Sequence, residues 1–195
     1  MASPDLTRFD NSWYSSGRTR FVEALWFLIG LPVLRSRFIP FSRVQGTVLR
    51  LFGAYIAPGV VLKPGIRVKY PWLLSVGANS WIGEDVWIDN LAQVTIGSNA
   101  CVSQGAYLCT GNHNWADPTF SLIVEPITLG NGSWVGARAV ICPGANLGEC
   151  SVASAGSIVT KSVPPFEIHA GNPARLVRHR QIDEHFVSHI TRRPR

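Results

Sequence analysis

The sequence has 195 residues, a length that suits one domain with a terminal arm. Hydrophobic residues make up 46% of it and charged residues 15%, which excludes an intrinsically disordered chain. The 18 glycines and 13 prolines are too many for a helical bundle and follow no collagen period. The four cysteines form no Cys-x-x-Cys pair, so we expect no zinc site, no disulfide framework and a cytoplasmic location.

The net charge of +6 is unevenly distributed along the chain. Residues 1–50 and 163–195 carry 13 of the 18 basic residues and 6 of the 12 acidic ones, whereas residues 51–162 carry 5 and 6. Because the basic residues are terminal and no platform of alternating aromatic and basic residues is visible, we predict no nucleic-acid partner.

The longest apolar run covers residues 21–34 and is interrupted by Glu23 and Pro32. It is shorter than the roughly 20 apolar residues of a membrane-spanning helix. The spacing favours a helix with one apolar face, formed by Phe21, Leu25, Trp26, Leu28 and Ile29. Arginines lie at both of its ends: Arg18, Arg20, Arg35 and Arg37.

Two interpretations of this helix stay open. It packs on the body of the protein, as part of an arm or cap over residues 1–50, or it lies on the inner membrane face through residues 18–37.

From residue 56 onwards, aliphatic residues recur every six residues in groups of three, and each of the first coils has eighteen residues plus a two-residue insertion. Triplets begin at Ile56, Val76 and Ile96, and the register resumes at Leu129. Fifteen positions fit: Ile56, Leu62, Val68, Val76, Ile82, Ile88, Ile96, Val102, Leu108, Leu129, Val135, Ile141, Leu147, Ala153 and Val159. Such a repeat predicts an all-β solenoid over 51–165, with three short strands in each coil and the aliphatic side chains stacked inside a triangular prism.

The repeat is interrupted between Leu108 and Leu129 by a polar, aromatic and proline-containing stretch. We predict a loop over 109–126 that leaves the prism, and long loops on rigid scaffolds are often functional. For the C-terminal segment, 166–195, we expect a short helix. His185 and His189 in that segment have helical spacing but no third ligand, so we predict no metal site.

Several stretches resemble known acetyltransferases. Residues 129–178, with Leu-Gly-Asn-Gly-Ser-Trp-Val-Gly, Ala-Gly-Ser-Ile-Val-Thr-Lys and Gly-Asn-Pro-Ala-Arg, are similar to the coenzyme-A-binding end of galactoside, maltose and nodulation-factor acetyltransferases. Five segments resemble the colanic-acid-biosynthesis acetyltransferases: 9–14, 50–54, 69–72, 87–91 and 103–115. The resemblance implies a left-handed parallel β-helix, acetyl-CoA as co-substrate without a metal, and a homotrimer whose active sites lie between two prisms.

His113 is the candidate catalytic residue. Acetyl transfer to an alcohol needs a general base, and histidine is suited to that role near neutral pH. His113 is the only histidine between residues 51 and 162, and the match to the family implies that it is the base. Asn114 follows it where Asp is common in the group, so the sequence does not show what orients the imidazole.

The resemblance also implies binding residues. Asn90 and Asp89 correspond to acceptor-contacting positions, although Asn at a corner also satisfies its own backbone. Asp89 could instead orient His113 of a neighbouring subunit. The implied coenzyme A contacts are Trp134 along the pantetheine arm, the backbone near Ala137 and Ala155, and, at the nucleotide and its phosphates, Thr160, Lys161, Arg175 and Arg178. A surface tryptophan and a solvated basic end are the alternatives.

Three functions remain open from the sequence. The first is O-acetylation of a saccharide in exopolysaccharide biosynthesis, on an acceptor that is free or lipid-linked, by direct attack on the thioester. The second is acetylation of a small diffusible acceptor such as a free sugar, serine or an antibiotic. The third is a β-helix scaffold without catalysis.

Overall fold

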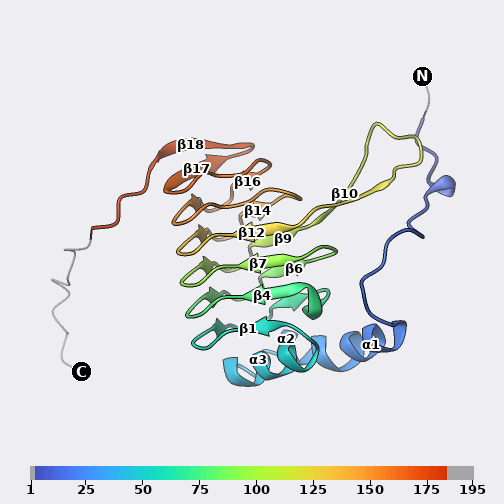
Figure 1. The fold of residues 1–195 in the computed structure, drawn as a ribbon, viewed down its shortest axis with the longest axis horizontal. Coiled ribbons are helices and arrows are strands. Elements are labelled where there is room, and N and C mark those ends of the chain that lie inside the picture. Colours follow the sequence, from blue (N-terminus) through green and yellow to red (C-terminus); the bar gives the residue numbers. More distant parts are fainter. Residues whose placement is uncertain (1–2, 184–195) are drawn as a thin grey trace.

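The computed structural model describes residues 3–183, in which short strands wind into a solenoid of triangular cross-section (Figure 1). Helices precede the solenoid: η1 (Leu6–Arg8), α1 (Arg20–Leu25), the π-helix η2 (Trp26–Gly30), α2 (Leu31–Arg35) and α3 (Ser42–Leu51). A single turn, η3 (Pro71–Leu73), lies within it.

Three sheets form the sides of the prism, each with one strand from successive coils. Sheet A contains β1 (Tyr55–Ile56), β4 (Leu74–Val76), β7 (Val94–Ile96) and β12 (Ile127–Leu129). Sheet B contains β2 (Val61–Leu62), β5 (Trp81–Ile82), β8 (Cys101–Val102), β13 (Trp134–Val135), β15 (Val152–Ala153), β17 (Glu167–Gly171) and β18 (Ala174–His179). Sheet C contains β3 (Arg67–Val68), β6 (Trp87–Asp89), β9 (Tyr107–Cys109), β14 (Val140–Ile141) and β16 (Ile158–Val159).

The inward side chains stack in columns, as the hexapeptide register predicts. In sheet A, parallel pairing places Ile56 beside Val76, Val76 beside Ile96 and Ile96 beside Leu129. All fifteen predicted positions are buried, and none is more than 5% exposed. The predicted parallel β-helix is therefore confirmed, and its interior is filled by aliphatic side chains.

Three corners connect the sheets, and each is named by the sheets it joins. The AB corner contains residues 77–80, 97–100 and 130–133, together with their counterparts in other coils. The BC corner contains 83–86, 103–106, 136–139 and 154–157. The CA corner contains 90–93, 110–126 and 160–162. The predicted loop thus leaves the prism at the CA corner, where β10 (Gly111–His113) and β11 (Leu122–Val124) form an antiparallel hairpin.

The helical cap lies across the end of the prism beside β1 (Figure 1). Trp26 is completely buried and its indole Nε1 donates to the Val68 carbonyl at 3.0 Å. Its ring lies against the backbone at Gly30, where a Cβ would collide with it. Leu34 and Leu49 are buried with it. The packed interpretation of the apolar run therefore holds for this side of the helix.

The expected apolar face of this helix is divided by the structure. Trp26 points into the cap, whereas Phe21, Leu28 and Ile29 are exposed. The π-helical turn explains the difference, because its i to i+5 hydrogen bond from Leu31 N–H to the Trp26 carbonyl shifts the phase of the side chains. Among residues 3–183, no helix is long and apolar enough to cross a bilayer.

The expected C-terminal helix is wrong for the part of that segment that the structure describes. Strands β17 and β18 form an antiparallel hairpin, and β17 pairs with β15. The physical reason is that β15 would otherwise end sheet B with unpaired backbone groups. Residues 184–195, with His185 and His189, lie outside the described residues.

We expect Gly77→Ala to destabilise the solenoid by about 1–3 kcal/mol. A Cβ at Gly77 would lie 2.5 Å from Ser98 N and 2.6 Å from Gly97 C, so the next coil would have to move. The matched control is Gly46→Ala in α3, where the nearest atom is a side-chain nitrogen at 3.5 Å. That change should stabilise by about 0.5–1 kcal/mol through helix propensity. Chemical denaturation measures both, and equal effects would contradict the steric account.

Candidate functional site

His113 ends β10, outside the prism and on the predicted loop. Its ring Nδ1 lies 2.9 Å from the carbonyl oxygen of Phe120. A carbonyl oxygen only accepts, so in the neutral ring Nδ1 carries the proton and Nε2 keeps its lone pair. A backbone carbonyl thus supplies the orientation that the sequence leaves without a carboxylate.

Two aromatic rings hold the imidazole. Phe120 stacks on His113 with ring centroids 4.3 Å apart and planes at 10°, and Phe9 contacts it edge-on at 5.5 Å. Phe120 has a φ of 53°, a left-handed conformation that is uncommon outside glycine. The ring of His113 is therefore fixed on one side by its own loop and on another by the N-terminal arm.

Hydrogen bonds tie the arm and the loop together. The Asp5 N–H donates to the Pro118 carbonyl at 2.8 Å, and the Tyr14 hydroxyl donates to the Leu91 carbonyl at 2.8 Å. Within the loop, hydrogen bonds from Ser121 and then Thr119 lower the pKa of Asp117 to about 2. Asp117 therefore stays ionised and keeps these bonds through the neutral range, and loses them only as the pH falls towards that value.

A groove of about 500 Å³ follows the BC corner at the end of the prism far from the cap. Its floor includes Trp134, Ala137 and Ala155, and Arg178 and Arg180 come from the C-terminal hairpin and the residue after it. The Trp134 indole N–H donates to Ser103 Oγ at 2.9 Å, which fixes the ring along sheet B. A long chain with a charged end fits this shape, because the lining is apolar along its length and cationic at one side.

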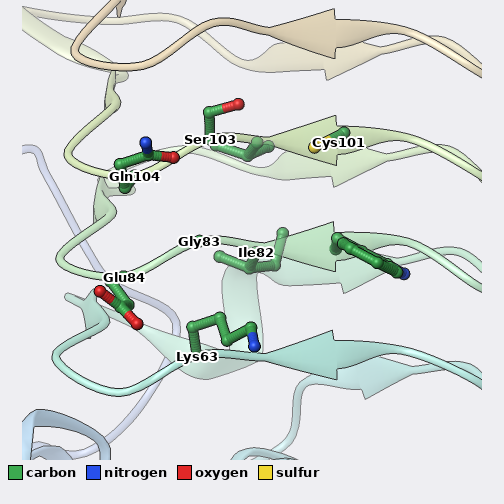
Figure 2. A pocket seen from close by; sticks show the side chains of 9 residues that line it. Lys63, Ile82, Gly83, Glu84, Cys101, Ser103 and Gln104 are labelled. Carbon is green, nitrogen blue, oxygen red and sulfur yellow. The ribbon is translucent and has the colours of Figure 1, made fainter. Parts of the chain in front are cut away.

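A second hollow of about 350 Å³ continues along the same corner towards the cap. It shares Ser103 and Gln104 with the groove, and Trp81 lies on its sheet B side with 58% of its surface exposed. Figure 2 shows Lys63, Glu84 and Gln104 in it, on successive coils. The groove and this hollow therefore lie one after the other along a single corner of the prism.

Comparison with known proteins decides the family. WcaF of Escherichia coli K12, described as a colanic acid biosynthesis acetyltransferase, is 36% identical over 176 residues, which cover 90% of this chain and 97% of WcaF. The galactoside O-acetyltransferase of the same organism is 34% identical over 128 residues, 64% of this chain and 63% of that protein.

The chain belongs to the hexapeptide-repeat acetyltransferases.

Solved structures agree with the fold. A hexapeptide-repeat acetyltransferase from Vibrio cholerae, complexed with acetyl coenzyme A, has a TM-score of 0.77 at 21% identity over 89% of this chain and 93% of its own. Galactoside acetyltransferase in complex with coenzyme A has a TM-score of 0.71 at 26% identity, covering 82% and 80%. No family model matches the chain.

The acetyltransferase places its predicted cofactor residues at two different corners. Trp134, Ala137, Ala155 and Arg178 come together in the groove at the BC corner. Thr160 and Lys161 are exposed at the CA corner, from which the His113 loop also leaves. Arg175 is exposed on β18 and donates to the Ala174 carbonyl. Eight further residues line the groove without having been predicted as cofactor contacts: Ser103, Gln104, Gly136, Val152, Ala153, Ser154, Ile168 and Arg180. Phe9 was also missed, although it begins one of the segments that carry the family resemblance.

Asn90 lies inside the CA corner and not on the surface. Its Oδ1 accepts from the Tyr70 N–H at 3.0 Å, and its Nδ2 donates to the carbonyls of Tyr70 at 2.6 Å and Leu73 at 3.0 Å. The residue is completely buried. Its amide thus satisfies backbone groups of Tyr70 and Leu73 in the preceding coil and not its own backbone.

Asp89 is held by two neighbours on sheet C. Lys69 Nζ lies 3.1 Å from its Oδ1, and the Tyr107 hydroxyl donates to its Oδ2 at 3.1 Å. Burial, followed by the hydrogen bond with Cys109, raises the pKa of the Tyr107 phenol, so Tyr107 stays protonated and keeps donating. Asp89 is therefore held within its own chain by an ion pair at Oδ1 and a hydrogen bond at Oδ2.

We expect Asn90→Ala to cost about 2–4 kcal/mol of stability, because it leaves buried backbone groups of Tyr70 and Leu73 without partners. Asn131→Ala is the matched control. Asn131 is exposed and accepts one bond, from the Ser98 N–H, so its loss should cost about 0.5–1.5 kcal/mol. Thermal unfolding measures the two. An Asn90→Ala protein with unchanged stability and reduced activity would instead support contact with the acceptor.

Proposed function

We propose that the enzyme transfers the acetyl group of acetyl-CoA to a saccharide hydroxyl, with His113 as the general base. The observation that carries this proposal is the 2.9 Å contact between His113 Nδ1 and the Phe120 carbonyl oxygen. The Phe120 carbonyl accepts a hydrogen bond from Nδ1–H, so the neutral ring offers the lone pair of Nε2 to a hydroxyl. A loop histidine that only packs would need no such constraint, and a non-catalytic scaffold would need no base.

The chemistry needs few further groups. Nε2 of His113 takes the proton of the acceptor hydroxyl while the hydroxyl oxygen attacks the thioester carbonyl carbon. The tetrahedral intermediate then loses its carbon–sulfur bond, and the thiolate of coenzyme A leaves and takes the proton from the imidazolium. No acyl-enzyme forms, so one base suffices for both proton transfers.

The groove at the BC corner suits acetyl-CoA. Of the two solved structures compared above, one contains acetyl coenzyme A and the other contains coenzyme A. The pantetheine arm is a thin amide-containing chain, and the floor formed by Trp134, Ala137 and Ala155 offers it apolar contact and backbone amides. Arg178 offers charge-assisted hydrogen bonds to the phosphates.

The second hollow suits the acceptor. An exposed indole such as that of Trp81 provides a flat apolar face, and Lys63, Glu84 and Gln104 provide donors and acceptors around it. A sugar ring has an apolar face surrounded by hydroxyl groups, so it would match this arrangement. The similarity to WcaF favours an acceptor in exopolysaccharide biosynthesis over a small diffusible acceptor.

The active enzyme is proposed to be a homotrimer, because within one chain the candidate base His113 and the groove for acetyl-CoA lie at different corners of the prism. His113 leaves the prism at the CA corner, whereas the groove and the hollow follow the BC corner. A cyclic trimer would bring the loop of one copy to the groove of the next. Thr160 and Lys161, at the same corner as the loop, would then approach the nucleotide from that neighbouring copy.

We expect His113→Ala to lower kcat by about two to four orders of magnitude, the usual contribution of a general base, while coenzyme A still binds. The measurement is thiol release from acetyl-CoA with a panel of free, nucleotide-linked and lipid-linked saccharides, beside calorimetric titration with coenzyme A. His179→Ala, an exposed histidine on β18, is the matched control. Turnover within threefold of wild type in His113→Ala would refute the assignment.

Mixing two inactive variants tests whether sites are shared between copies. We expect His113→Ala and Ala155→Trp, which fills the groove, to be inactive alone. In trimers assembled from equal amounts of both, about a quarter of the sites would combine an intact His113 with an intact groove. Activity should therefore recover to about a quarter of wild type. No recovery in confirmed mixed trimers would show that each chain uses its own His113.

A further inference from the structure

The outer surface of the helical cap is apolar and has no partner within residues 3–183. Three exposed apolar residues are spaced along α1, η2 and α2. Leu28 lies about two helical turns after Phe21, and Pro32 lies about one turn after Leu28. Phe21 is 73% exposed, Leu28 is 76% exposed and Phe38, after α2, is 96% exposed. Further exposed apolar side chains on the cap are Ile29, Phe41, Val44 and Leu51.

This surface is also hollowed. A depression of about 620 Å³ lies between Phe27, Leu31, Pro32 and Phe38, with Arg35 at its rim. The side chains that hold the cap on the prism, Trp26 and Leu34, are completely buried. The outer residues are therefore not needed to close the β-helix, and leaving so many of them in water is unfavourable.

The charge around this surface is mainly positive. Residues 18–51 contain six arginines and one acidic residue, Glu23. Glu23 accepts a hydrogen bond from the Ser16 hydroxyl, so its charge is turned towards the arm. Arg20 and Arg35 are exposed on the helices of the cap, and Arg37 forms an exposed ion pair with Asp85 at its edge. Arg43 and Arg50 line a separate hollow between α3 and the first coil.

We propose that the outer surface of the cap binds an anionic lipid bilayer. An amphipathic helix with exposed Phe and Leu on its apolar side and arginines beside them is the composition that inserts at the headgroup boundary. Arginines in that position attract anionic headgroups. A neutral apolar partner protein would match the phenylalanines and leave the arginines unpaired, so a lipid surface accounts for both features.

The position of the cap connects this inference with the proposed function, on which this step rests. Lys63, in the first coil above the cap, already lines the acceptor hollow, and the groove for acetyl-CoA begins further along the corner. A saccharide that extends from a lipid in the bilayer would therefore meet the acceptor hollow first. In a cyclic trimer, the three caps would face the same side and bind the bilayer together.

Vesicle flotation tests the inference on the full chain. The probes are phosphatidylcholine vesicles, alone or with about 30% phosphatidylglycerol, at low and at high salt. We expect wild type to float with the anionic vesicles at low salt and largely to dissociate at high salt. The double variant Leu28→Ser with Phe38→Ser should bind at least about tenfold more weakly. Val177→Ser, which is 62% exposed on β18 at the other end of sheet B, is the matched control and should bind as wild type.

The remaining outcomes are decisive. Wild type that never floats, or a double variant that floats as well as wild type, would overturn the inference. Light scattering that shows pairs of trimers in wild type and single trimers in the double variant would assign the surface to a second copy of the chain. Acetyl transfer to free, nucleotide-linked and lipid-linked saccharides, measured on the same samples, separates the two proposals. Protein that floats without turnover on any of these acceptors contradicts the function, and turnover without flotation contradicts only the membrane surface.

Discussion

Close stacking of one coil on the next is the constraint on which the rest of this structure depends. Each strand pairs in parallel with its counterpart in the neighbouring coil, so the backbone of one coil lies directly on the backbone of the next. At Gly77, Gly97 and Gly136 the approach leaves no room for a Cβ. Such stacking fills the interior with aliphatic columns and turns each corner into a straight edge.

A filled interior leaves the outside of the prism for function. The groove and the hollow follow one straight edge because equivalent corner residues repeat at every coil, such as Glu84 and Gln104 or Ala137 and Ala155. The candidate base is not part of the repeat. His113 lies instead on a hairpin that leaves the repeat, and the Phe120 carbonyl and the Phe9 ring provide the rigidity that a free loop lacks.

The N-terminal arm serves three parts of the molecule at once. Phe9 contacts His113, Trp26 closes the end of the prism, and Phe21 and Leu28 face outward. Because the arm runs from the loop to the cap, it joins the proposed catalytic base to the proposed bilayer surface within one segment (Figure 1). The two sides of the cap helix therefore have different roles: the inner side stabilises the fold, and the outer side is the proposed bilayer surface.

The sequence by itself determined the parts of this protein that depend on local periodicity. A repeat of six residues fixes which side chains point inward, so all fifteen core positions, the interruption after Leu108 and the isolation of His113 could be predicted without coordinates. Only the tertiary structure decided what depends on contacts between distant segments. The buried amide of Asn90 satisfies a turn seventeen to twenty residues earlier, and a π-helical turn sends Trp26 inward and Leu28 outward. The partner that orients His113 is a backbone carbonyl, which every residue type carries equally, so no residue pattern could have revealed it.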